Sequence, residues 1–222
     1  MHPRILLERV IMVDSSIHTI KFRIRIFIDF WNFSLALREH DDTFRVDWTP
    51  IGNLLTKEAG RIIDTNTIAS FEGMHVYGSY DPNKPEDAKL KNWFSNWLDK
   101  QPGIHTTILP RQRKKGYPKC PKCHKETTHC VACGSDMRGT EEKGVDTSIV
   151  KDMISLAWVN AYDVAVLVSA DRDFVPVADF LQSKGVKVIH GAFPPKGSDL
   201  SQKCWGNFDL TKLMPQFRKS SG

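Results

Sequence analysis

No stretch of this 222-residue chain comes near the roughly 18 consecutive apolar residues that a membrane-spanning helix needs. The first residues are also broken by Glu8 and Arg9 before an apolar signal core could form. Cysteine is scarce, with four of the five cysteines between positions 120 and 133 and only Cys204 elsewhere, which favours a metal site over a disulfide framework. We therefore expect a cytoplasmic protein, with residues 1–20 as a loosely attached N-terminal extension.

Acidic residues are missing from one window of the chain. Positions 111–125 hold seven Lys or Arg and no Asp or Glu, although the whole chain carries a net charge of only +5. The other residues therefore sum to −2. A basic segment on a faintly acidic body is typical of phosphate-backbone binding, and a solvated face that only keeps the segment soluble is the alternative.

Apolar segments of strand length alternate with amphipathic helical patterns along the chain, and no internal repeat is evident. We expect strands at 21–29, 71–80, 105–109, 163–169 and 186–193, helices at 34–40, 50–63, 85–100, 145–160 and 173–184, and one more short helix within 198–217. This alternation predicts an α/β fold with a parallel sheet and right-handed crossovers.

Acidic residues follow two of the most apolar predicted strands. The first strand ends in Asp29, the fourth runs into Asp171 and Asp173, and Asp146 opens a helix. If the two strands are neighbours, these carboxylates meet at one edge of the sheet. Like charges at such a place require a counter-ion, and one or two Mg²⁺ or Mn²⁺ ions would supply it. A divalent ion held this way can activate water and bind a phosphate, so phosphodiester hydrolysis is the predicted chemistry.

Each acid also has a structural interpretation. Asp146 and Asp173 stand where helix N-caps are needed, and Asp29 and Asp171 could be ordinary loop acids. We favour the metal interpretation because the acids occur together, at the ends of the most apolar strands.

Three motifs resemble the NYN domains of the PIN-like nuclease superfamily, including its LabA-like branch. They are IDFWN at 28–32, KGVD at 143–146 and SADRDF at 169–174, and they occur in the family's order. The resemblance covers most of residues 22–213 and implies a three-layer α/β/α sandwich with a mainly parallel sheet. The activity it implies is metal-dependent RNA cleavage. It also implies that Asp29, Asp146, Asp171 and Asp173 bind the metal and that Asn32 orients the water or a phosphate oxygen.

The chain departs from the family pattern at two positions. The first motif usually has Gly where this chain has Phe30, and the third usually has Gly where it has Ala170. Phe30 could narrow the cleft or pack into the core. It is the best support for the alternative that the protein is a catalytically inactive PIN-like module that binds RNA or a protein partner.

The clustered cysteines follow the spacing C-x₂-C-x₆-C-x₂-C. Four thiolates at this spacing can close a tetrahedron around one structural Zn²⁺, and a redox dithiol is the weaker alternative. His124 and His129 could replace a cysteine, though a full set of four needs neither. We expect a basic zinc-ribbon insert at 111–139 that interrupts an NYN domain formed by 21–110 and 140–217. The four predicted zinc ligands are Cys120, Cys123, Cys130 and Cys133.

Nucleic acid, most simply RNA, is the expected partner, with no membrane and with a homodimer left open. The residues expected to contact it are Arg111, Arg113, Lys114, Lys115 and Lys143, with Trp31 as a candidate for base stacking. His105 and His190 lie in predicted strands, and we interpret both as packed residues and not as catalytic bases.

Overall fold

The computed structural model describes residues 20–64 and 68–220, and six parallel strands form its central sheet in the order β3-β2-β1-β6-β7-β8. These strands are β1 (Lys21–Asp29), β2 (Ile68–Tyr80), β3 (Ile104–Pro110), β6 (Val164–Val168), β7 (Lys187–Ala192) and β8 (Gly206–Asp209). The predicted parallel sheet is confirmed. The extension predicted for residues 1–20 lies, apart from Ile20, outside the described residues.

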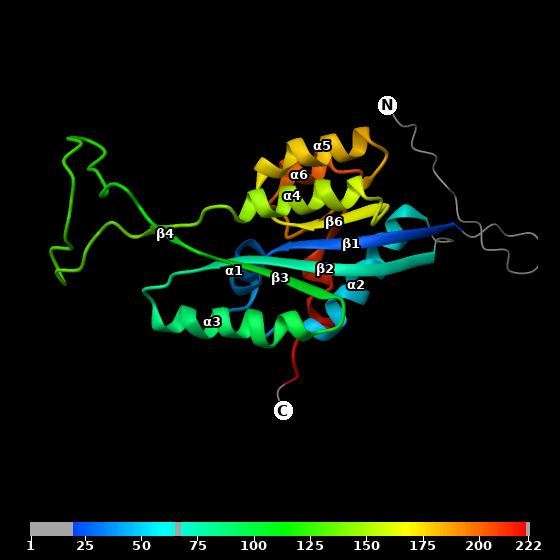
Figure 1. Ribbon diagram of the computed structural model, residues 1–222, viewed down its shortest axis with the longest axis horizontal. Coiled ribbons are helices and arrows are strands. Elements are labelled where there is room, and N and C mark those ends of the chain that lie inside the picture. The colour runs from blue at the N-terminus through cyan, green and yellow to red at the C-terminus, as the bar shows by residue number, and fades with distance from the viewer. Residues whose placement is uncertain (1–19, 65–67, 221–222) are drawn as a thin grey trace, which may run out of the picture.

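Helices cover both faces of this sheet, as Figure 1 shows. One face carries α1 (Phe30–His40), α2 (Trp48–Ile63) and α3 (Pro85–Asn96), and the other carries α4 (Val145–Trp158), α5 (Val175–Ser183) and α6 (Ser198–Lys203). Short 3₁₀ turns are η1 (Leu98–Lys100), η2 (Arg172–Phe174), η3 (Leu210–Lys212) and η4 (Met214–Gln216). The three-layer α/β/α architecture that the resemblance implied is therefore confirmed.

The central strands are apolar on both sides because each side meets a helical layer. In β1, Ile24, Ile26 and Ile28 pack toward the α1–α3 layer, while Phe27 packs toward α4 and α5. All five residues of β6 are buried. This two-sided burial explains the nearly continuous apolar sequence of both strands.

The strand order reverses between β1 and β6. From β1 the chain proceeds outward through β2 and β3 on one side, and β6, β7 and β8 follow on the other. In an open parallel sheet, such a reversal leaves a crevice beyond the carboxyl ends of the two central strands. Asp29 ends β1 and Asp171 follows β6, so both lie at the end of the sheet where this crevice is expected.

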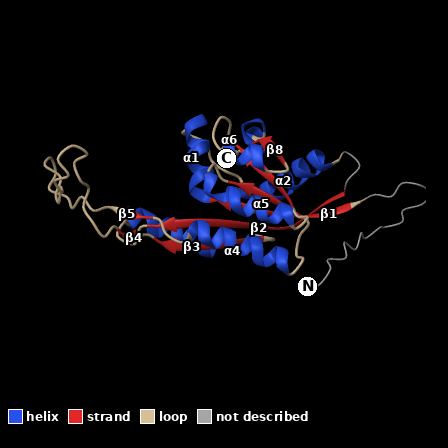
Figure 2. Cartoon of the chain, turned by 90° about the horizontal axis from the view of Figure 1, so that it is seen from above, coloured by secondary structure: helices blue, strands red, loops and turns tan. Residues whose placement is uncertain are grey.

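A long arm, residues 112–141, leaves the sheet at the end of β3. Its base is a two-stranded antiparallel ribbon of β4 (Gln112–Arg113) and β5 (Thr140–Glu141). The rest of the arm projects away from the α/β body (Figure 2). No arm residue belongs to either apolar cluster of the described chain, so the body does not depend on the arm for its core.

Some element boundaries differ from those predicted. α1 begins at Phe30 and not near position 34, because the Asp29 side chain caps it. The tail contains α6 as predicted and also β8, an edge strand that was not predicted. None of the described helices has the length and apolar composition needed to cross a membrane.

Candidate active site

Asp29 lies at the end of β1 with only 2% of its surface exposed. One carboxylate oxygen accepts hydrogen bonds from the backbone N–H groups of Trp31 and Asn32, both at 3.1 Å. The other oxygen accepts from the Asn32 side-chain amide and, at 3.3 Å, from the Ser169 hydroxyl. Burial raises the pKa of Asp29, and the hydrogen bonds from Asn32 oppose that rise. Asp29 therefore caps the N-terminus of α1, in addition to its predicted role as a metal ligand.

The loop that follows β6 is tied directly to this carboxylate. Asn32 donates to Asp29 and accepts from the backbone N–H of Ala170 at 3.3 Å, so it bridges the two central strands. Asp171 caps η2 by accepting from the backbone N–H of Asp173 at 2.9 Å. Of the four predicted metal ligands, Asp29 and Asp171 are therefore the N-caps, whereas the structural interpretation of the sequence had placed Asp146 and Asp173 at N-caps.

Asp146 stands in the first turn of α4. Gly144 precedes the helix with φ +88°, a left-handed conformation that favours glycine and explains the KGVD motif. The Asp146 side chain makes no cap hydrogen bond. Burial and then the charges of Asp29, Asp171, Glu142 and Asp173 raise its pKa to about 6. The other carboxylates that the sequence predicted to converge therefore lie within electrostatic reach of Asp146.

Glu142 is the member of this acidic group that sequence reasoning missed. It raises the pKa of both Asp29 and Asp146, so its charge faces the same crevice. The residue directly follows the arm, two positions before Gly144. Its neighbour Glu141 pairs outward with Lys143, and nothing in the local sequence says which of the two glutamates turns inward.

The acidic group suits a hard divalent cation by its chemistry. All of its potential ligands are carboxylate oxygens, which Mg²⁺ and Mn²⁺ prefer. Burial, and after it repulsion by the other carboxylates, raises the pKa of Asp146, and a bound cation would offset this repulsion. Within residues 20–64 and 68–220, however, no three Asp, Glu, His or Cys side chains are placed to hold a metal ion. The acids therefore form a charge cluster that a cation would have to draw together.

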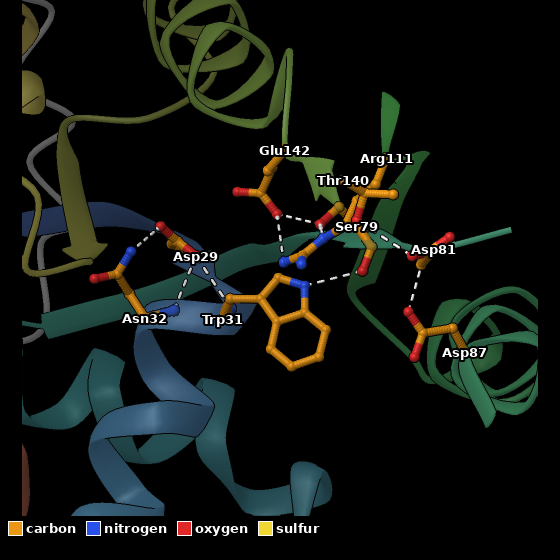
Figure 3. Close-up of polar contacts among 9 residues, drawn as sticks. All are labelled: Asp29, Trp31, Asn32, Ser79, Asp81, Asp87, Arg111, Thr140 and Glu142. Carbon is orange, nitrogen blue, oxygen red and sulfur yellow. Dashed lines mark hydrogen bonds and ion pairs between the residues drawn. The ribbon is translucent and has the colours of Figure 1, made fainter. Parts of the chain in front are cut away.

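Arg111, Ser79 and Trp31 form a polar network beside the acids (Figure 3). The Trp31 indole N–H donates to the carbonyl oxygen of Ser79 at 2.9 Å, and the Ser79 hydroxyl donates to Glu142. The Arg111 guanidinium donates to Ser79 Oγ at 3.0 Å and lies 5.3 Å from the centroid of the Trp31 ring. Base stacking on Trp31 stays a prediction, and Arg111 covers the ring in this conformation.

Phe30 packs into the core and does not narrow the crevice. Its ring is 8% exposed and meets Trp31, Trp48, Trp93 and Phe94, with ring centroids 5.0–6.3 Å apart. The departure from the family's glycine is therefore absorbed by the α1–α3 layer. This removes the main sequence argument for an inactive module.

His190 is buried beneath the loop after β6. Its Nε2–H donates to the carbonyl oxygen of Ser169 at 2.7 Å, and its Nδ1 accepts from the Ser201 hydroxyl at 2.7 Å. Burial lowers the pKa of His190, which keeps the ring neutral. The interpretation of His190 as a packed residue is confirmed. For His105 it holds only in part, because this side chain is exposed on β3 although its ring centroid lies 4.9 Å from that of His75.

Replacing His190 with alanine is expected to destabilise the protein by about 3 kcal/mol. The change leaves a cavity and two unpaired hydrogen-bonding groups, the Ser169 carbonyl and the Ser201 hydroxyl. Urea unfolding at neutral pH measures this loss. The matched variant His105→Ala, at an exposed position, should change the unfolding free energy by no more than about 0.5 kcal/mol. Equal losses in the two variants would contradict this role of His190.

The cysteines of the arm lie in two hairpins with the same backbone pattern. In each, the N–H of the first cysteine donates to the carbonyl five residues later, and the N–H four residues later donates back to that cysteine. His124 and Gly134 occupy equivalent left-handed turns, with φ of 57° and 71°. The backbone thus repeats every ten residues, although the sequences of the two hairpins share little besides the cysteines.

The four cysteine thiols are free, and two have a lowered pKa. Backbone N–H groups of Cys123 and Lys122 lower the pKa of Cys120, and the Ser135 hydroxyl lowers that of Cys133. Both effects favour the thiolate, the form that binds zinc. The two hairpins do not bring the four sulfur atoms to one point. Cys204 is half-buried against the α4–α5 layer, and burial raises its pKa to about 12.

The predicted nucleic-acid contacts fall into two groups. Arg113 pairs with Asp136 at 2.6 Å and Lys143 with Glu141 at 2.9 Å. Lys114 and Lys115 are exposed on the arm and form no ion pair within the described part of the chain. The unpaired charge therefore lies on the arm, and Arg111 lies at its root, beside the acids.

Comparison with known families decides the relationship. The model of the NYN domain matches residues 23–210. The chain belongs to the NYN domain family. This domain is part of the PIN-like nuclease superfamily, whose members typically use divalent metal ions and act on nucleic acid.

One solved structure supports the fold of this NYN domain. It is the crystal structure of a protein of unknown function from Vibrio parahaemolyticus RIMD 2210633, with 17% sequence identity and a TM-score of 0.53. The match covers 90% of this chain and 96% of that one. At this identity the likeness supports the fold alone. A search of curated proteins finds no match.

Proposed function

We propose that this NYN domain is a Mg²⁺- or Mn²⁺-dependent endoribonuclease that hydrolyses phosphodiester bonds. The observation that carries the proposal is the gathering of carboxylates around Asp146 at the strand-order reversal, with the pKa of that residue raised to about 6. Negative charge that has no counter-charge within the group of carboxylates favours the binding of a divalent cation. Family membership supports a nucleic-acid substrate.

The residues that would hold one or two ions are Asp29, Asp146, Asp171 and Asp173. A bound divalent ion supplies Lewis acidity toward phosphate oxygens and activates a water molecule. The protein's own contribution is positional. Asn32 links Asp29 to the loop that carries Asp171, so the two central strands present their carboxylates as one unit. We also propose that Asn32 orients the attacking water or a phosphate oxygen.

We also propose that residues 111–139 act as a zinc-ribbon insert within a domain formed by 21–110 and 140–217, on the LabA-like branch of the family. The paired hairpins and the thiols of lowered pKa support one structural Zn²⁺ bound by Cys120, Cys123, Cys130 and Cys133. The exposed Lys114 and Lys115 support a role in holding the phosphate backbone.

The test is cleavage of labelled single-stranded RNA with added Mn²⁺ and without added divalent ions, with no chelator present that would also remove the proposed zinc. Wild-type protein should cleave only with the metal, and Asp171→Asn should be inactive because an amide is a poor ligand for a divalent ion. Asn caps a helix about as well as Asp, so this variant should remain folded. Asp179→Asn, an exposed position on α5, is the matched control and should cleave normally. Equal cleavage by wild type and Asp171→Asn would refute the proposal.

Mn²⁺ should raise the melting temperature more at pH 7.5 than at pH 5.5. At a free Mn²⁺ concentration of about 100 times the dissociation constant, binding adds about 2.7 kcal/mol to the unfolding free energy. This gain should fall as the pH drops through about 6, because Asp146 then takes up a proton that competes with the ion. Without metal, the dependence of the stability on pH has the opposite sign. The folded state binds this proton more tightly than the unfolded chain, so stability falls as the pH rises toward 6. Differential scanning fluorimetry measures both trends, and a pH-independent Mn²⁺ shift would contradict them.

A further inference from the structure

Arg111 joins the root of the arm to the acidic group. Its backbone N–H donates to the carbonyl oxygen of Tyr80 at 2.7 Å, which fixes the residue at the end of β3. Its guanidinium contacts Ser79 and the Trp31 ring, and one nitrogen lies 3.9 Å from a Glu142 carboxylate oxygen. About 30% of the side chain is exposed, so the guanidinium is held at the surface and not sealed in the core.

Glu142 belongs to this network and to the acidic group at once. The same carboxylate oxygen that faces Arg111 accepts the hydrogen bond of the Ser79 hydroxyl. The negative charge of Glu142 is also felt by Asp29 and Asp146. Arg111 is therefore the counter-charge of one of the five acids at the crevice (Figure 3).

The two partners stand at the two roots of the arm. Arg111 precedes β4 and Glu142 follows β5, and both meet Ser79 on β2. Thr140 adds a hydrogen bond to Asp81 at 3.2 Å, so the arm is fastened to the end of β2 on both sides. A nucleic-acid strand that runs from the exposed lysines of the arm toward the acids passes this junction.

We propose that Glu142 competes with the substrate for Arg111: in the free protein the pair is closed, and on RNA binding a backbone phosphate next to the cleavage site takes the guanidinium. Arginine binds phosphate with two parallel hydrogen bonds, which is a better match than the long contact to Glu142. The exchange uncovers the Trp31 ring, and Glu142 then adds its negative charge to the acidic group without a counter-charge from Arg111. This inference rests on the proposed function, since it requires an RNA substrate.

The experiment is RNA affinity without added Mg²⁺ or Mn²⁺ and without a chelator, so that the proposed zinc is kept and no cleavage occurs, by fluorescence anisotropy with a labelled single-stranded RNA. Glu142→Gln keeps an oxygen for Ser79 but cannot hold Arg111 by charge, so it should bind RNA about threefold to tenfold more tightly than wild type. Arg111→Gln should weaken binding by a similar factor. In the Arg111→Gln background, adding Glu142→Gln should give no further gain.

The matched control is Glu58→Gln, which frees Arg61 on α2 in the same way and should leave affinity within about twofold. A residue that only supported the fold would weaken RNA binding when changed, so the sign of the effect distinguishes the two roles. Weaker or unchanged binding by Glu142→Gln, or an equal gain without Arg111, would overturn the inference. If wild type cleaves RNA but Glu142→Gln binds unchanged, only the inference fails. If wild type does not bind RNA, the proposed function fails.

Discussion

Replacing Asp146 with asparagine is expected to lower the rate of RNA cleavage at least about a hundredfold while making the metal-free protein more stable. Asp146 is the cleanest position for this test because its side chain caps no helix. Four other acids repel its carboxylate and, with burial, raise its pKa to about 6. Removing the charge therefore relieves the folded state and removes one predicted metal ligand.

The expected gain in stability is no more than about 1 kcal/mol, because Asp146 is exposed and solvent screens its carboxylate. For a chain of this size it corresponds to a rise of about 2–4 °C in melting temperature. Thermal unfolding without added Mg²⁺ or Mn²⁺ and initial cleavage rates in Mn²⁺ measure the two effects on one preparation. Asp179→Asn should change neither. A variant that is both inactive and less stable would point to a structural role for Asp146.

Replacing one cysteine of each pair, as in Cys123→Ser with Cys133→Ser, is expected to reduce the zinc content from one ion per chain to none. A four-thiolate site cannot close with two ligands missing, and structural zinc contributes most of the folding energy of small metal-bound segments. The α/β body should remain folded, because no described residue of the arm belongs to its apolar clusters. RNA affinity should fall about tenfold as the basic arm loses its structure.

Elemental analysis of the purified protein gives the zinc content, and circular dichroism reports the body. Cys204→Ser is the matched control, because it removes the cysteine outside the arm and should keep one zinc per chain. Zinc retained by the double variant, or zinc lost in Cys204→Ser, would contradict the predicted site. Loss of the whole fold in the double variant would contradict the independence of the body.

Much of the fold can be predicted from the local sequence pattern. β1 and β6 were predictable because burial on both faces makes a strand continuously apolar. β8 was not, because it is a four-residue edge strand with a single buried residue, Phe208. The early start of α1 depends on the Asp29 side chain turning back onto its own backbone, which a periodicity argument does not detect.

Some residues of the candidate site could likewise be predicted from the sequence, and others could not. The convergence of Asp29, Asp146 and Asp171 could be predicted because strand ends in a parallel sheet share one edge. The place of Glu142 could not, because it depends on an ion pair with Arg111 and a hydrogen bond from Ser79, which are 31 and 63 positions away along the chain. The burial of Phe30 likewise depends on α2 and α3, which supply its aromatic neighbours.

The chemical nature of the product ends tests the central claim most directly. The measurement compares RNA fragments formed in Mn²⁺ by wild type and by Asp171→Asn, prepared side by side, for 5′-phosphate and 3′-hydroxyl ends. Hydrolysis by activated water at the acidic group predicts 5′-phosphate ends from wild type and no fragments from the variant. Fragments with 2′,3′-cyclic phosphate ends, or the same fragments from both proteins, would contradict the account.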